Sequence, residues 1–160
     1  MIVRAMSKRW LGVVVSSTDL SAVDATIDVD YVINADMTWP LQKGARWQAY
    51  SLMFERVRDY LQEAAIDAVV LKGSAVSMGG TTLAHLEAAE LRGVVQAAAV
   101  AANAKVIVIQ QNALSRNFGS RKADEYIKDD SFWAAKPIKG EKVRKASRAA
   151  LLLMIYENER

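Results

Sequence analysis

Cysteine is absent from this chain of 160 residues. Disulfides, thiolate metal sites and cysteine nucleophiles are therefore excluded, and the absence fits a reducing compartment. Histidine occurs once, at His85, so the chain lacks the paired histidines that zinc enzymes carry at helical spacing. The hydroxyl side chains at residues 16–18 have no histidine beside them in the sequence, which argues against serine catalysis.

A hydrophobic run of membrane-spanning length is also missing, although 52% of the residues are hydrophobic. The longest candidate, residues 83–102, is interrupted by charged side chains that include Glu87, Glu90 and Arg92. The first ten residues carry three basic side chains and lack the apolar centre of a signal peptide. We therefore expect a cytoplasmic location and no membrane partner.

Charge is unevenly distributed along the chain. The net charge of +3 is too small to indicate nucleic-acid binding by itself, but acids gather early and cations late. The early acids are Asp19, Asp24, Asp28, Asp30 and Asp36. The late cations are Lys136, Lys139, Lys142, Arg144, Lys145 and Arg148, interrupted by a single acid, Glu141. If the protein binds nucleic acid, we expect these six cations to supply most of the phosphate contacts.

Hydrophobic periodicity predicts a mixed α/β fold. The valine-rich run at residues 10–15 is typical of a buried central strand, and the alternation at residues 22–28 predicts a half-solvated antiparallel strand. Helices are indicated where apolar residues recur at spacings of three and four, and Thr81 or Thr82 can cap the second one. The predicted strands cover residues 10–15, 22–28, 31–36, 68–71 and 106–109, and the predicted helices cover residues 46–65, 82–102, 122–128 and 142–156.

Four segments of the chain fall in an order that is typical of a known family. They are WLGVVV at residues 10–15, DAVVLK at 67–72, LRGVVQAAA at 91–99 and KASRAAL at 145–151. In that order they resemble the first strand, the strand of the second catalytic acid, the long helix and the last helix of RuvC-type Holliday-junction resolvases. The resemblance implies a ribonuclease H-like mixed sheet, with an antiparallel three-strand opening, parallel strands after it and flanking helices. We expect one domain over residues 1–160, with its core at about 9–110 and 141–157 and a variable segment at about 111–140.

The resemblance also implies a two-magnesium site, for which this sequence lacks the ligands. RuvC-type nucleases hold the ions with carboxylates from the first strand, the fourth strand and the last helix. The corresponding positions here are Val14, Lys72, Lys145 and Arg148. An apolar side chain and three cations cannot hold Mg²⁺. We therefore expect no cofactor, unless other acids rebuild the site, and Asp19, just past the first strand, is the candidate for a relocated acid.

Lys72, Lys145 and Arg148 are expected to converge where the ions would sit. There they would either hold a phosphate or pair with Asp19 and close the site. Asp24 and Asp28 fall on one face of their strand, and we interpret that face as the solvated side of an edge hairpin.

Aromatic residues are interspersed with basic residues between residues 118 and 148, as in proteins that bind single-stranded or branched nucleic acid. The aromatic residues are Phe118, Tyr126, Phe132 and Trp133. The same pattern fits a helical excursion whose aromatic rings pack on the core and whose charges are solvated. The basic field is diluted by the acids Asp124, Glu125, Asp129 and Asp130. The sequence leaves both interpretations open.

The sequence therefore supports three functional hypotheses. The first is a catalytically degenerate RuvC-like module that binds DNA or RNA, or a protein partner, through Lys72 and the six late cations. The second is a divergent magnesium-dependent endonuclease of the Holliday-junction resolvase type. The third is a structural or assembly protein on the same fold. Because the helix at residues 82–102 carries small and β-branched residues on more than one face, we also predict a homodimer through this helix.

Overall fold

The computed structural model describes residues 7–75, 79–110, 112–114 and 121–160. The strands are β1 (Lys8–Val15), β2 (Asp19–Ile27), β3 (Tyr31–Pro40), β4 (Ala68–Lys72), β5 (Lys105–Ile109) and β6 (Ile138–Gly140). The helices are α1 (Arg46–Glu63), α2 (Leu83–Ala101), α4 (Ala123–Lys128), α5 (Asp130–Ala134) and α6 (Arg148–Glu159), with a 3-10 turn, η1 (Lys145–Ser147), before α6. The six strands form one sheet in the order β5-β4-β1-β2-β3-β6. The pairs β1–β2 and β2–β3 are antiparallel and the pairs β1–β4 and β4–β5 are parallel, as the sequence predicted, and the unpredicted β6 pairs parallel to β3.

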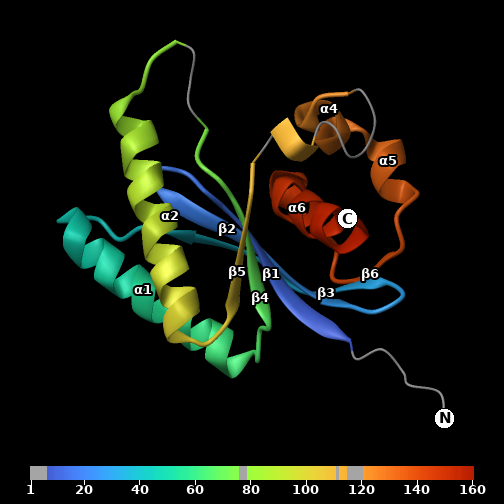
Figure 1. Cartoon of the computed structure of the whole chain (residues 1–160), viewed down its shortest axis with the longest axis horizontal. Coiled ribbons are helices and arrows are strands. Elements are labelled where there is room, and N and C mark those ends of the chain that lie inside the picture. Colours follow the sequence, from blue (N-terminus) through green and yellow to red (C-terminus); the bar gives the residue numbers. More distant parts are fainter. Residues whose placement is uncertain (1–6, 76–78, 111, 115–120) are drawn as a thin grey trace.

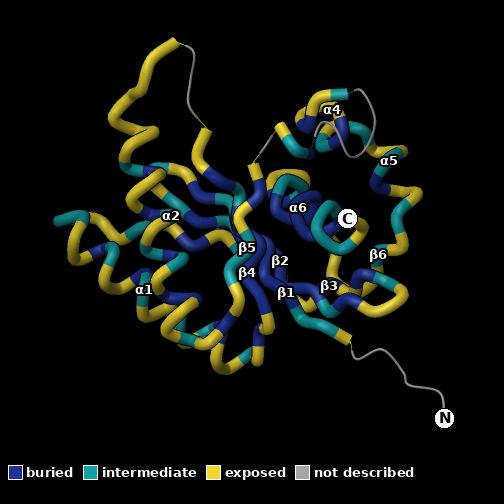
Figure 2. The backbone as a smooth tube through the Cα atoms, in the orientation of Figure 1, coloured by how far each residue is buried: buried dark blue, intermediate teal, exposed yellow. Residues whose placement is uncertain are grey.

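Helices cover both faces of the sheet (Figure 1): α1 and α2 pack on one face, and α6, with α4 and α5 beside it, covers the other. The alternation of side chains along β1 divides the core between these faces. Leu11 and Val13 belong to the cluster with α1 and α2, whereas Trp10 and Val14 pack in the cluster with α6. Figure 2 shows that the buried residues concentrate in the central strands and in α6.

Helix α6 packs closely against the central strand at Gly12. A Cβ atom at this position would overlap the carbonyl oxygen of Ala150 and would lie 3.1 Å from Cγ of Met154. Only glycine allows the helix backbone to approach the strand this far, which explains the glycine in the first-strand segment. The contact fixes α6 against β1 and β4.

The second strand is not half-solvated, so that prediction was wrong. β2 lies between β1 and β3 and is not an edge strand. Asp24 is 0% exposed, because α1 covers this face of the sheet and contributes Tyr60, which donates a hydrogen bond to the carboxylate. Asp28, which the alternation placed on the same face, lies past the end of the strand and is exposed.

The last helix begins at Arg148, six residues later than predicted. The cations at residues 142–145 disfavour a helix start there, because the positive end of the helix dipole repels them. Arg144 is extended instead, with φ −65° and ψ 150°, and its backbone N–H donates to Asp36. β6 and α5 were not predicted, since elements of three and five residues are too short to show a period.

The second predicted helix is confirmed, and its cap is Thr82. The Thr82 hydroxyl accepts a hydrogen bond from the backbone N–H of His85, while the backbone N–H of Thr82 donates to the imidazole. The single histidine of the chain therefore belongs to a capping box. Among the described helices, none is both long and apolar enough to cross a membrane.

Candidate nucleic-acid interface

The ends of β1 and β4 bring Val14 and Lys72 to the same edge of the sheet, on the face that α6 covers. The strands are parallel neighbours, with Val13 paired to Leu71, so their carboxyl ends coincide. Val14 is partly buried in the core cluster that contains α6. Lys72 is partly buried beside a small cavity, whose other lining residues are Leu114, Ala123, Asp124, Ile127, Ala149 and Leu153.

The residues at this edge do not fit a pair of divalent cations. Such a site needs several carboxylates close together. Among the described residues, no group of three or more histidine, cysteine, aspartate or glutamate side chains could hold a metal ion. The segments outside the described part contain none of these four residue types. Asp19 lies beside the end of β1, as the hypothesis of a relocated acid requires, but its carboxylate accepts a hydrogen bond from the Ser16 hydroxyl at 3.0 Å.

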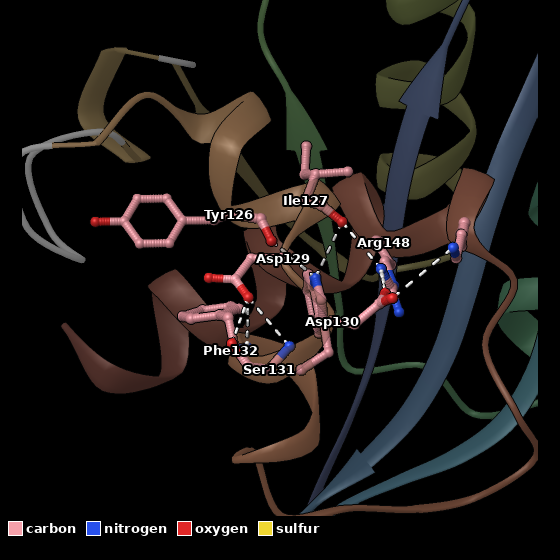
Figure 3. Close-up of polar contacts among 9 residues, drawn as sticks. Tyr126, Ile127, Asp129, Asp130, Ser131, Phe132 and Arg148 are labelled. Carbon is pink, nitrogen blue, oxygen red and sulfur yellow. Dashed lines mark hydrogen bonds and ion pairs between the residues drawn. The ribbon is translucent and has the colours of Figure 1, made fainter.

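Lys145 and Arg148 do not join Lys72, and they do not pair with Asp19. Both pair with Asp130 at the start of α5, and Figure 3 shows the contact of Arg148 with this carboxylate. The Arg148 guanidinium donates from Nη1 to Asp130 Oδ1 at 2.8 Å and to the Ile127 carbonyl at 3.2 Å. Lys145 Nζ lies 3.9 Å from the other carboxylate oxygen. These cations hold the pKa of Asp130 below its usual value, through the hydrogen bond from Arg148 first and the charge of Lys145 second. The predicted convergence of three cations was therefore wrong.

An open cavity of about 440 Å³ lies at the N-terminal end of α6. We call it the basic cavity, and its lining residues are Asp130, Lys142, Val143, Arg144, Lys145 and Arg148. Four of these residues are cations and one is an acid. A second cavity of about 340 Å³ shares Lys142, Val143 and Arg148 with it and extends the hollow toward β6.

Asp36, on β3, anchors the segment that lines the basic cavity to the sheet through Arg144 and Ser147. Its side chain is 3% exposed and accepts hydrogen bonds from the Arg144 guanidinium, the Arg144 backbone N–H and the Ser147 hydroxyl. Burial opposes ionisation of Asp36, but the bonds from Arg144 and Ser147 outweigh it and lower the pKa. Sequence reasoning did not identify this contact.

Two of the early acids, Asp30 and Asp36, form ion pairs with late cations in the folded protein. Beyond the Asp36–Arg144 pair, Lys139 Nζ lies 2.8 Å from Asp30, and this carboxylate raises the pKa of Lys139. Lys136 pairs with Glu159 at 3.3 Å. Among the six late cations, Lys142 is exposed and has no acidic partner within 4.0 Å in the described part of the chain. Much of the local positive charge is thus balanced, and the surplus concentrates at the basic cavity.

The described aromatic residues of the late segment pack inward. Tyr126 and Trp133 are buried in the cluster with α6, and Phe132 packs against it. The Trp133 indole N–H donates to the Tyr126 carbonyl at 3.0 Å. Phe118 lies outside the described residues. The interpretation as a core-packed excursion therefore holds for these three residues.

Comparisons with known proteins identify the fold. No family model matches the sequence, and no curated protein matches it. RuvC of Thermus thermophilus in complex with a Holliday-junction substrate matches with a TM-score of 0.70 and 11% identity, over 95% of each chain. The same protein in another structure matches with a TM-score of 0.69 and 12% identity, over 94% of this chain and 95% of that one. The yeast mitochondrial Holliday-junction resolvase Ydc2 matches with a TM-score of 0.63 and 11% identity, over 98% of this chain and 86% of that one. The chain therefore has the ribonuclease H-like fold in its RuvC-like form.

Proposed function

We propose that this protein is a RuvC-like module that binds nucleic acid through the basic cavity and does not cleave it by metal catalysis. One observation carries the proposal: four cations line a single cavity that contains one carboxylate. Lysine and arginine supply most of the charged contacts that proteins make to phosphates. The proposal covers residues 1–160 as one module in the cytoplasm, with the variable segment at about 111–140.

The charge at the cavity is available to a ligand. The Lys145 side chain is 80% exposed, and its ion pair with Asp130 is long and open to solvent. Exposed pairs of this kind contribute little to stability, so a phosphate can replace the carboxylate at small cost. Lys142 has no acid to displace among the residues that the structure describes. The fold agrees with this ligand class, because one of the similar structures holds a Holliday junction.

The absence of metal-dependent cleavage follows in this proposal from Val14 and Lys72. An apolar side chain and a cation occupy the strand ends where RuvC-type nucleases carry acids. A divergent nuclease would need several carboxylates that gather at this edge, whereas Asp19 and Asp124 belong to no group of three or more possible ligands in the described part of the chain. If no nucleic acid binds, the same cations point to an acidic protein surface as the partner.

We also propose a homodimer through the outer face of α2. Leu86 and Val100 are 55% and 67% exposed on this helix, and Gly93 lies exposed between them. Their spacing of seven residues places them along one stripe, which a second copy of the helix could cover.

A salt titration tests the nucleic-acid proposal. Fluorescence anisotropy with single-stranded, duplex and four-way-junction DNA should show binding that weakens steeply as salt rises, because bound phosphates release counterions. Lys142→Ala/Lys145→Ala should weaken binding to each DNA similarly and lower the salt slope by about two. The matched control is Lys43→Ala/Lys105→Ala, which removes two exposed lysines from other surfaces. Equal losses in the two double variants, or no binding to DNA or RNA at low salt, would reject the proposal.

A further inference from the structure

The second cavity differs in chemistry from the basic cavity beside it. Its volume is about 340 Å³, and its apolar lining consists of Trp133, Ile138, Val143 and Leu151. Among the described residues that line the basic cavity, Val143 alone is apolar. An apolar hollow therefore adjoins a cationic one, and the volume of each lies within the range of about 300–1,000 Å³ that is usual for ligand pockets.

The two cavities share part of their walls. Lys142, Val143 and Arg148 line both of them. The Arg148 guanidinium lies 5.7 Å from the centre of the Trp133 ring, and its Nη1 lies 2.8 Å from Asp130 Oδ1. Arg148 thus contacts an apolar residue of the second cavity and an acid of the basic cavity. A ligand that joins an anionic group to an apolar one can occupy both cavities at the same time.

The walls of the second cavity are fixed by contacts within the protein. The Trp133 indole N–H donates to the carbonyl oxygens of Tyr126 and Ile127, at 3.0 and 3.2 Å. On the opposite side, β6 pairs with β3, and the backbone N–H of Glu141 donates to the Ile33 carbonyl at 3.0 Å. A preformed pocket orders few groups when a ligand enters, so little conformational entropy is lost on binding.

We propose that the second cavity holds an unpaired nucleobase whose phosphate lies in the basic cavity. The proposal rests on the proposed function and narrows the ligand to nucleic acid with unpaired nucleotides. A nucleotide joins a charged phosphate to a flat base with apolar faces, which matches the division of charge between the two cavities. The bases of a duplex are stacked and paired and cannot enter, whereas the bases of a single strand can be splayed out and held.

The test compares a single-stranded oligothymidylate with a strand of abasic tetrahydrofuran units that has the same length. Both strands carry the same phosphates, so the counterion release on binding is matched. In anisotropy titrations at low salt, the wild type should bind the oligothymidylate about tenfold more tightly, the scale expected for one base held against an aromatic surface. Ile138→Phe fills the second cavity without a change of charge and should remove most of this preference. The matched control Val108→Phe, in the strand at the other edge of the sheet, should keep it.

A second measurement uses the wild type alone and does not depend on the folding of Ile138→Phe. The indole N–H resonance of Trp133, which Trp133→Phe identifies by its loss, should shift with the oligothymidylate and stay in place with the abasic strand or a fully paired duplex. Lys142→Ala/Lys145→Ala should weaken the binding of both strands by similar factors, because it removes phosphate contacts.

The outcomes separate this proposal from the one on which it rests. If neither strand binds, the proposed function fails and the base site fails with it. If both strands bind equally well, the basic cavity still binds phosphate but the second cavity holds no base. The base site is also rejected if the Trp133 resonance responds to both strands alike, or if Ile138→Phe keeps the preference as Val108→Phe does.

Discussion

Arg144 and Asp36 form a two-point ion pair across 108 residues of sequence, with Arg144 Nη2 2.9 Å from Oδ1 and Nε 3.1 Å from Oδ2 of Asp36. The backbone N–H of Arg144 donates to the same carboxylate at 2.8 Å. The carboxylate is almost fully buried, whereas half of the Arg144 side chain remains exposed. Asp36 thus fixes the segment that carries the basic cavity while it leaves the cation available at the surface.

The Asp36 contact predicts a pH-dependent part of stability. The pKa of Asp36 is lowered in the folded state, so the contribution is complete above the unfolded pKa of about 3.9 and is lost as the pH falls through the folded value. At pH 7, Asp36→Asn should lower the free energy of unfolding by about 1 kcal/mol or more. In urea titrations the difference from the wild type should shrink below about pH 4. A difference that does not change with pH would mean that the ionised carboxylate is not the cause.

A second prediction concerns divalent cations. With Val14 and Lys72 at the strand ends, calorimetry should detect no tight, stoichiometric Mg²⁺ or Mn²⁺ binding, and a four-way junction should stay intact in either ion. The decisive variant is Asp19→Asn. If Mn²⁺ binds stoichiometrically to the wild type and supports cleavage of the junction, and this variant abolishes both, the divergent-nuclease hypothesis is correct.

The sequence predicted the parts of the fold that carry long periodic patterns. The strand at residues 10–15 and the capped helix at residues 82–102 are both present, because the first is a continuous apolar run and the second repeats its apolar residues over several turns. The order of the first five strands followed from the same patterns together with the family resemblance. β6 was missed because its three residues carry no repeat.

The candidate site was predicted less well, because its residues meet through tertiary contacts. The late cations were recognised as a group, but nothing local marks Asp36 as the partner of Arg144. Asp130 was treated only as an acid that dilutes the basic field, since the short helix α5 that presents it was not predicted. Lys72 was identified through the resemblance, but the small cavity beside it was not predicted, because its lining comes from several separate elements.

Asp24 and Asp28 provide a third prediction. The sequence pattern places both on one solvated face, whereas in the structure Asp24 is buried and Asp28 is exposed. Asp24 accepts hydrogen bonds from Arg9 at 2.7 and 2.9 Å and from Tyr60 at 2.5 Å. Asp24→Ala should lower the free energy of unfolding by about 3 kcal/mol, because it leaves these donors without their acceptor. Asp28→Ala should change it by less than about 0.5 kcal/mol, as is usual at exposed positions. Urea unfolding of both variants measures the contrast, and similar losses would contradict the burial of Asp24.

The proposed homodimer gives a fourth prediction. Sedimentation at tens of micromolar protein should show a dimer, within the range of moderate protein–protein affinities. Leu86→Glu should shift it to a monomer, because the substitution buries a charge in the α2 interface. Leu52→Glu is the control, since Leu52 is 44% exposed on α1 instead. A monomeric wild type, or equal dissociation in both variants, would exclude the α2 interface.

Asp36 and Asp130 lead to the last prediction, since neutralising either acid adds the same charge near the basic cavity. Simple electrostatics predicts tighter DNA binding in both cases. The structure predicts opposite effects. Asp130 lines the cavity with 69% of its side chain exposed and forms ion pairs with Arg148 and Lys145. Its carboxylate therefore competes with a phosphate for these two cations. Asp36 is nearly buried and positions Arg144 and Ser147.

Asp130→Asn should therefore tighten DNA binding by about two- to fivefold, which corresponds to the release of a weak surface ion pair. Asp36→Asn should weaken it despite the added positive charge, because Arg144 loses the contact that orients it. Asp59→Asn, on the opposite face of the sheet, makes the same charge change at an exposed site and should leave affinity nearly unchanged. Anisotropy titrations at one low salt concentration compare the three variants. If all of them bind more tightly by similar factors, net charge alone controls the affinity and Asp36 has no positioning role.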